Sequence, residues 1–187
     1  MIRPVLVTGR PGIGKSTVVM KTIDLLRREG LVAGGMVTKE ARQGELRSGF
    51  RIIDLLTGQE GWLALVGANK GIRFGRYMVC PEDLEHLGVR AITNALADRN
   101  VSVVIVDEIG PMELTSERFR EAIRTCQEST KMLLATIHYS SKDPLLSQLR
   151  RTPGAEIVVV TLENRDSLPQ SLSHIIANDI RGQMVLR

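Results

Sequence analysis

The stretch of sequence that decides the fold is residues 5–17, VLVTGRPGIGKST. It matches the pattern G-x-x-x-x-G-K-[ST] at every fixed position, between an apolar run and residues with helical apolar spacing. Glycines let the backbone approach an anion, so the loop amides can surround phosphates. We expect Lys15 to reach the β- and γ-phosphates and the Ser16 hydroxyl to bind Mg²⁺. The predicted phosphate-binding residues are Gly9, Arg10, Pro11, Gly12, Ile13, Gly14, Lys15, Ser16 and Thr17.

Composition narrows the class of protein. The 187 residues suit a single domain, residues 1–187, with a sizeable core. The net charge of +4 comes without a strong basic cluster, and aromatic residues make up only 3%, so nucleic acid is not an expected partner. No signal peptide or apolar run of membrane length is visible. We therefore expect a cytoplasmic monomer that does not bind membranes.

Apolar periodicity predicts an α/β protein, because buried strands alternate with helices. The expected strands are 5–7, 31–38, 101–106, 132–137 and 157–161. The expected helices are 16–29, one from 81 to about 95, 116–127, 143–151 and 169–180. Five such strands indicate a doubly wound, mostly parallel five-stranded sheet flanked by helices.

One part of the chain departs from this alternation. Residues 50–56 and 62–66 flank the turn-forming segment 57–61, which is typical of a hairpin. Because hairpin strands are antiparallel, residues 39–66 are predicted to form an antiparallel β insertion on the parallel core. Residues 67–80 follow no clear pattern beyond a short strand at 77–79.

A second motif follows the most apolar strand, where Val103, Val104, Ile105 and Val106 lead into Asp107 and Glu108. A strand that ends in a carboxylate has the Walker B arrangement, in which Asp107 would hold Mg²⁺. Glu108 is placed to activate a water in line with the γ-phosphorus as a general base. The alternative roles for Glu108 are a solvated loop residue or a salt-bridge partner of an arginine.

Further motifs accompany these two, in the order GMVTKE (35–40) with Arg42, Arg47-x-Gly49-Phe50, DEIGPMEL (107–114) and VTLENRD (160–166). Together they resemble the thermophilic nucleoside-triphosphatase family, also called cancer-related nucleoside-triphosphatases. The resemblance implies Mg²⁺-dependent hydrolysis of ATP, GTP and other nucleoside triphosphates to diphosphate and phosphate. It also implies an ATPase-type sheet, in which another strand separates the Walker B strand from the phosphate-loop strand. The nucleotide-contacting set then extends to Ile109 and Gly110.

The resemblance also points to residues that would supply positive charge near the γ-phosphate. Arg42 and Arg47 match family positions and are candidates for a catalytic arginine, with a solvated surface arginine as the alternative for each. The family usually carries His-Arg after the fourth core strand, whereas this chain reads His138-Tyr139. His138 is therefore a candidate nucleotide contact or a simple polar strand-end residue, and another group must replace the missing arginine.

Asn164 and Arg165 follow the last core strand, at the edge where nucleotide bases dock in open α/β sheets. We expect Asn164 to hydrogen-bond the base and Arg165 to stack on it. The same residues also suit an ordinary turn before the final helix.

Two other functions share these motifs. A nucleotide or small-molecule kinase would need an acceptor pocket and an arginine-rich lid, and residues 138–152 contain no compact lid. A nucleotide-dependent adaptor for cofactor biosynthesis would have no use for a water-activating Glu108. The sequence therefore favours a nucleoside-triphosphatase.

Overall fold

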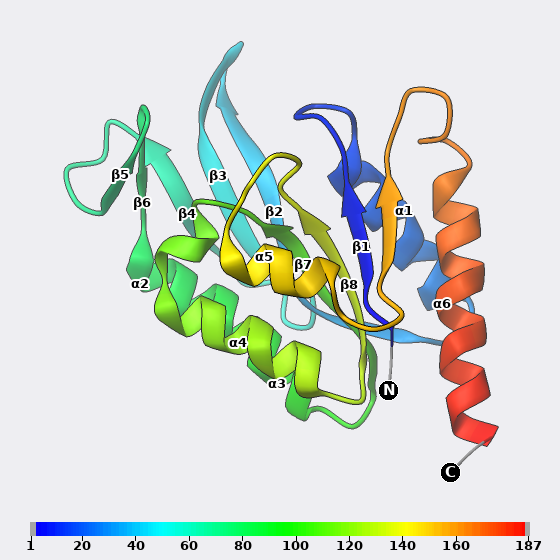
Figure 1. Ribbon diagram of the computed structural model, residues 1–187. Helices are drawn as coiled ribbons and strands as arrows, with labels where there is room; N and C mark the ends of the chain where they lie inside the picture. The colour runs from blue at the N-terminus through cyan, green and yellow to red at the C-terminus, as the bar shows by residue number, and fades with distance from the viewer. Residues whose placement is uncertain (1–2, 186–187) are drawn as a thin grey trace.

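The computed structural model describes residues 3–185 and contains a mixed sheet of nine strands. The strands are β1 (Val5–Thr8), β2 (Val32–Gln43), β3 (Leu46–Asp54), β4 (Glu60–Val66), β5 (Ile72–Phe74), β6 (Tyr77–Val79), β7 (Val101–Ile109), β8 (Met132–Ile137) and β9 (Glu156–Val159). Their order across the sheet is β5-β6-β4-β3-β2-β7-β8-β1-β9 (Figure 1). The predicted α/β class is confirmed.

The parallel part of the sheet positions the site. β2, β7, β8, β1 and β9 pair in parallel, and β8 lies between β7 and β1, as the family resemblance implies. Because the carboxyl ends of parallel strands meet at one edge, the residues that follow β1, β7 and β8 come together there. The residues at this edge are the phosphate loop after β1, Asp107 and Glu108 near the end of β7, and His138 after β8.

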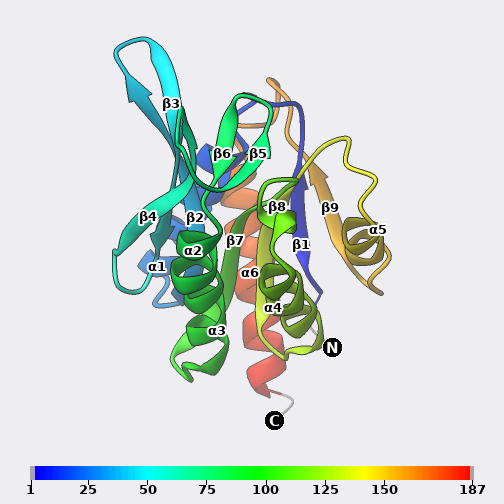
Figure 2. The same ribbon diagram turned by 90° about the vertical axis from the view of Figure 1, so that its left-hand side faces the viewer.

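Helices cover both faces of this parallel part. They are α1 (Lys15–Arg28), α2 (Pro81–Asp83), the π-helical η1 (Leu84–Val89), α3 (Arg90–Ala97), the 3-10 helix η2 (Glu113–Thr115), α4 (Glu117–Glu128), α5 (Pro144–Arg150) and α6 (Leu168–Val185). In Figure 2, α3 and α4 lie in front of the strands and α6 lies behind them. Within residues 3–185, no helix combines the length and the apolar character needed to cross a membrane.

Alternation along the strands builds one apolar core on each face, because successive strand side chains point to opposite sides. On β7, Val104 packs with Ile92 of α3 and Ile123 of α4. Its neighbour Ile105 instead packs with Ile23 of α1 and Ile176 of α6. The continuous apolar run in β7 is therefore the mark of a strand buried on both faces.

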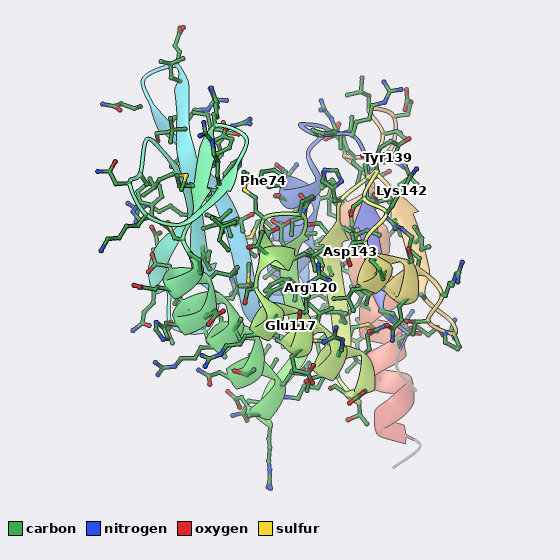
Figure 3. All side chains as sticks on the ribbon, turned by 60° about the vertical axis from the view of Figure 1, so that its left-hand side comes forward. Phe74, Glu117, Arg120, Tyr139, Lys142 and Asp143 are labelled. Atoms are coloured by element: carbon green, nitrogen blue, oxygen red, sulfur yellow. The ribbon has the colours of Figure 1, made fainter. Side chains whose placement is uncertain are left out.

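Local sequence fixes two helix starts near the site. The Ser116 hydroxyl caps α4 by accepting the Phe119 amide N–H, and the Asp143 carboxylate caps α5 by accepting that of Leu145. Asp143 also accepts two hydrogen bonds from the Arg120 guanidinium, at 2.7 and 3.1 Å. Both residues are labelled in Figure 3. This ion pair joins α4 to the loop that follows β8.

The sheet differs from the predicted five strands because β2 is longer than the expected strand 31–38. Its first part pairs in parallel with β7, and its second part continues to Gln43 and pairs antiparallel with β3. β3 and β4 form the predicted hairpin, but they extend the same sheet. The short hairpin of β5 and β6 then lengthens it further. We call β3, β4, β5, β6 and the second part of β2 the β extension.

The junction between β2 and β7 depends on Gly35, whose φ is +115°. A Cβ at this position would collide with the backbone carbonyl of Ile105 on β7. We expect Gly35→Ala to lower the free energy of unfolding by about 3 kcal/mol or more, because it combines φ strain with a backbone clash. Gly44→Ala is the matched control. Its φ is +62°, but a Cβ there meets open space, so the loss should be about 1 kcal/mol. Equal unfolding midpoints in urea for the two variants would contradict the close approach.

Candidate active site

The phosphate loop connects the buried strand β1 to α1 in a tight turn over residues 9–14. Gly12 and Gly14 have φ of +77° and +107°, a region that side chains with a Cβ rarely adopt. Gly14 is also the N-cap of α1, and no side chain caps that end. The first amides of α1 are thus left for an anion at the helix N-terminus.

Lys15 folds back over this loop. Its Nζ donates to the Gly9 carbonyl oxygen at 3.3 Å and lies 3.9 Å from Oε2 of Glu108. Its side chain is only 10% exposed, so the ammonium group is held at the mouth of the loop. The structure therefore brings together the phosphate-loop cation and the second carboxylate of the Walker B motif.

Asp107 is almost completely buried at the end of the apolar part of β7. Its Oδ1 accepts a hydrogen bond from the Thr136 hydroxyl of β8 at 2.5 Å, whereas the buried Oδ2 has no hydrogen-bond partner among the described residues. Burial raises the pKa of Asp107 to about 6. Hydrogen bonding from Thr136, and more weakly from the nearby Ser16 hydroxyl, opposes this increase. Ser16 is thus close to the carboxylate, although it does not satisfy Oδ2.

An unpaired buried carboxylate oxygen suits a divalent cation, which would neutralise its charge. Over residues 3–185 no group of three or more His, Cys, Asp or Glu side chains is placed to hold a metal ion. Mg²⁺ at a phosphate site typically needs only one or two protein ligands, because phosphate oxygens and waters supply the rest. Asp107 and the neighbouring Ser16 fit that requirement.

Glu113 in η2 is an acidic residue of the site that the sequence did not single out. Its side chain is buried, and Oε2 accepts the amide N–H of Gly110 at 3.1 Å. Burial raises its pKa to about 8, and the nearby charge of Glu108 acts in the same direction. Glu113 is therefore mostly protonated at neutral pH. Its one sequence signal was its place in the segment 107–114, where an acid stands among apolar residues.

The candidate cations of the β extension lie elsewhere. Arg42 and Arg47 flank the turn between β2 and β3, and both pair with Glu40, at 2.7 and 2.5 Å. Over the described part of the chain, neither makes an ion pair with Asp107 or Glu108. Figure 1 shows this hairpin extending beyond the ends of the other strands. The structure thus does not bring either guanidinium to the phosphate loop.

His138 and Tyr139 begin the loop after β8. The backbone N–H of His138 donates to the Ile109 carbonyl at 3.2 Å, which joins this loop to the end of β7. The buried Nδ1 of His138 has no hydrogen-bond partner among residues 3–185. Tyr139, which replaces the family arginine, is 51% exposed on the outside of this loop (Figure 3).

The remaining predicted site residues are Arg10, Asn164 and Arg165. Asn164 uses both ends of its amide within its own turn, accepting the Thr161 N–H at 2.8 Å and donating to the Val159 carbonyl at 2.9 Å. Asn164 thus forms the ordinary turn before the final helix that was predicted as the alternative to a contact with the nucleotide base. Arg165 and Arg10 are exposed to solvent.

Comparisons with known proteins show what the chain as a whole is similar to. A family model described as NTPase matches residues 4–173. A nucleoside-triphosphatase THEP1 from Thermofilum pendens is 50% identical over 175 residues, covering 92% of this chain and 94% of the relative. One from Methanosarcina acetivorans is 44% identical over 171 residues, covering 91% and 94%.

Two solved structures also resemble this chain over most of its length. The crystal structure of THEP1 from Aquifex aeolicus superposes with a TM-score of 0.80 at 32% identity, covering 92% of this chain and 98% of that one. The solution structure of a human cancer-related nucleoside triphosphatase also gives 0.80 at 32% identity, with 93% and 97% covered.

Glu113 should make stability depend on pH. Because its pKa is raised from 4.5 to about 8, its contribution is fully present below about pH 4.5 and is lost as the pH rises through 8. We expect the contribution of Glu113 to the free energy of unfolding to fall by about 3 kcal/mol from pH 5 to 8, measured by urea denaturation as the difference between the parent and Glu113→Gln. Glu113→Gln, which keeps an acceptor for Gly110 but cannot ionise, should be nearly flat above pH 7, where the contribution of Asp107 has already been lost. An unchanged decline between pH 7 and 8.5 in the variant would contradict the assignment.

Proposed function

Because this chain belongs to the NTPase family, we propose that it hydrolyses ATP, GTP and other nucleoside triphosphates to diphosphate and phosphate, with Mg²⁺ and with water activated by Glu108. That the chain is an enzyme acting on nucleoside triphosphates follows from its relatives. The observation that carries the finer proposal is the approach of Lys15 Nζ to Glu108 Oε2, at 3.9 Å. It supports a γ-phosphate position between a cation and a candidate base.

Phosphate binding would use the loop amides and Lys15. In the proposed complex the Lys15 ammonium exchanges the Gly9 carbonyl for β- and γ-phosphate oxygens, which are stronger partners for a cation. The unpaired amides at the start of α1, including those of Ser16 and Thr17, would donate to the same phosphates. Binding therefore requires only a small movement of one side chain.

Ser16 and Asp107 would hold Mg²⁺, on the evidence of the unpaired Oδ2. The chemistry that the ion supplies when bound is neutralisation of charge on the β- and γ-phosphate oxygens. Thr136 would orient Asp107 through its hydrogen bond to Oδ1, leaving Oδ2 for the metal. Asp107 itself must be ionised, so this role favours neutral over acidic pH.

Glu108 would accept a proton from the attacking water. Arrival of the phosphates would separate Lys15 from Glu108 and free the carboxylate for that role. Glu113 is mostly protonated at neutral pH, so it adds little negative charge beside Glu108. The hydrogen bond between Glu113 and Gly110 would position the loop after β7.

Arg42 and Arg47 remain proposed sources of additional positive charge, and one of them would have to leave Glu40 to act. For the base, we propose contact by the exposed Arg165, with Asn164 shaping the turn that presents it. Recognition by so few side chains should leave base selectivity weak.

The direct test is phosphate release from ATP, GTP, CTP and UTP without any acceptor. We expect all four to be hydrolysed with kcat/KM values within about 100-fold of one another, and EDTA to abolish release. Phosphate release that persists in EDTA would refute the Mg²⁺ requirement. A preference for one base above roughly 10⁴-fold would reveal a dedicated base pocket.

Two variants separate binding from chemistry. Glu108→Gln keeps the size and polarity of the side chain but removes the base, so kcat should fall by about 10²- to 10⁴-fold while Mg²⁺-ATP affinity is retained. Lys15→Ala should lose both affinity and rate, because its cation contacts phosphate throughout the reaction. Glu121→Gln, an exposed glutamate paired with Arg124 on α4, is the matched control and should leave both unchanged. Parent-like turnover in Glu108→Gln would remove Glu108 from the mechanism.

A further inference from the structure

A cavity of about 210 Å³ lies beside Glu108 and outside the phosphate loop. One wall belongs to the β extension and includes Phe50, Leu63 and Phe74. The other wall is formed by the end of β7, the segment 110–113 and His138. None of its lining residues belongs to the phosphate loop, residues 9–14, or to α1. Among the described lining residues, Glu108 lies next to Lys15 of the phosphate-binding motif, and Gly110 and His138 are also predicted nucleotide contacts.

The apolar wall of the cavity suits a ligand that contains a ring. Phe50 and Phe74 present two phenyl groups from different strands, and Leu63 and Met112 complete the apolar surface. Phe50 is held in place by Tyr77, whose ring centroid lies 5.3 Å away. Figure 3 shows Phe74 on the side of the β extension that faces the rest of the molecule. Aromatic pairs of this kind favour an inserted ring through offset or edge-to-face contacts.

The polar wall suits a neutral ligand with a hydroxyl group. It consists of Glu108, Glu113 and His138, and the described lining contains no lysine or arginine. A phosphate or carboxylate on the ligand would therefore lie against Glu108, whose charge would repel it, and the neighbouring cations Lys15 and Arg47 lie outside the described lining. The Nδ1 of His138 is buried and has no hydrogen-bond partner among the described residues, so a small shift of the imidazole toward the cavity would let it hydrogen-bond a hydroxyl group.

The volume of the cavity further limits the size of the ligand. At about 30 Å³ per water molecule, the cavity corresponds to roughly seven waters. It is smaller than the pockets of about 300 to 1,000 Å³ that take drug-sized ligands. One ring with a short hydroxyl-bearing arm matches this volume. The phosphate group of a nucleoside monophosphate makes it a poorer fit to the wall that contains Glu108.

We propose that this cavity binds a small uncharged ring compound whose hydroxyl group replaces water as acceptor of the γ-phosphoryl group. The proposal rests on the role of Glu108 argued above, because Glu108 forms the shared wall of the cavity and the phosphate site. Glu108 takes the hydroxyl proton as the hydroxyl oxygen forms a bond to the γ-phosphorus. The bond from that phosphorus to the β–γ bridging oxygen breaks, giving a phosphate monoester and the nucleoside diphosphate. The proton then passes from Glu108 to solvent.

The test uses the full chain with Mg²⁺-ATP and three neutral probes, namely benzyl alcohol, 4-(hydroxymethyl)pyridine and cyclohexylmethanol. Each is supplied at roughly 10 mM, above the millimolar affinity expected for a fragment of this size. ³¹P NMR distinguishes a new phosphate monoester from inorganic phosphate. We expect monoester from at least one probe, and none from benzoate, which carries a charge and no hydroxyl group.

Two variants on the same strand assign the activity to the cavity. Phe74→Ala removes a ring from the wall and should lower monoester formation about tenfold, while phosphate release without probe stays within about twofold. Ile72→Ala is the matched control, because Ile72 is a similarly exposed apolar residue of β5 outside the lining, and it should change neither rate. A third variant, Thr38→Leu on β2, should also lower monoester formation by filling part of the cavity.

The outcomes separate this inference from the proposed function. If no probe yields a monoester while phosphate release continues, the acceptor site is refuted and the hydrolysis proposal stands. If monoester forms equally in Phe74→Ala, the acceptor binds elsewhere and the cavity assignment is refuted. If neither monoester nor phosphate is released from ATP, the proposed hydrolysis itself fails.

Discussion

The parallel pairing of β8 between β1 and β7 is the constraint on which the site depends. It brings the ends of three strands to one edge of the sheet, so Lys15 and Glu108, more than 90 positions apart in the sequence, lie 3.9 Å from each other. The hydrogen bond from Thr136 to Asp107 joins β8 to β7 and fixes the direction of the buried carboxylate. Apolar packing on both faces then holds the strands rigidly, so the site needs no further scaffold.

Charge at this edge is nearly balanced. Asp107 and Glu108 are adjacent acids with Glu113 close by, and ionising all three in a buried place would be costly. The structure lowers that cost in two ways, since Lys15 lies beside Glu108 and Glu113 keeps its proton. What remains is one unpaired oxygen of Asp107, where a bound cation would complete the balance.

The sequence was most informative where local pattern and chemistry coincide. Residues 5–17 predicted a strand, an anion-binding turn and a helix together, because the motif works only in that order. It was least informative for β5, a three-residue strand whose partner is β6, although Gly75-Arg76 between Phe74 and Tyr77 is typical of a two-residue hairpin turn. Glu113 was missed as well, because its burial depends on long-range packing that no local pattern reports. The roles of the site residues stay predictions.

The dual pairing of β2 has a consequence for how such an enzyme diversifies. One continuous strand joins the parallel half of the sheet to the β extension, so the pairing along that strand holds the base of the extension to the core. The cavity beside Glu108 is partly lined by side chains of the extension. Under the acceptor proposal, exchanging Phe50, Leu63 or Phe74 would change which ligand binds without altering Lys15, Asp107 or Glu108. Ligand choice and phosphoryl transfer would then depend on different segments of one polypeptide.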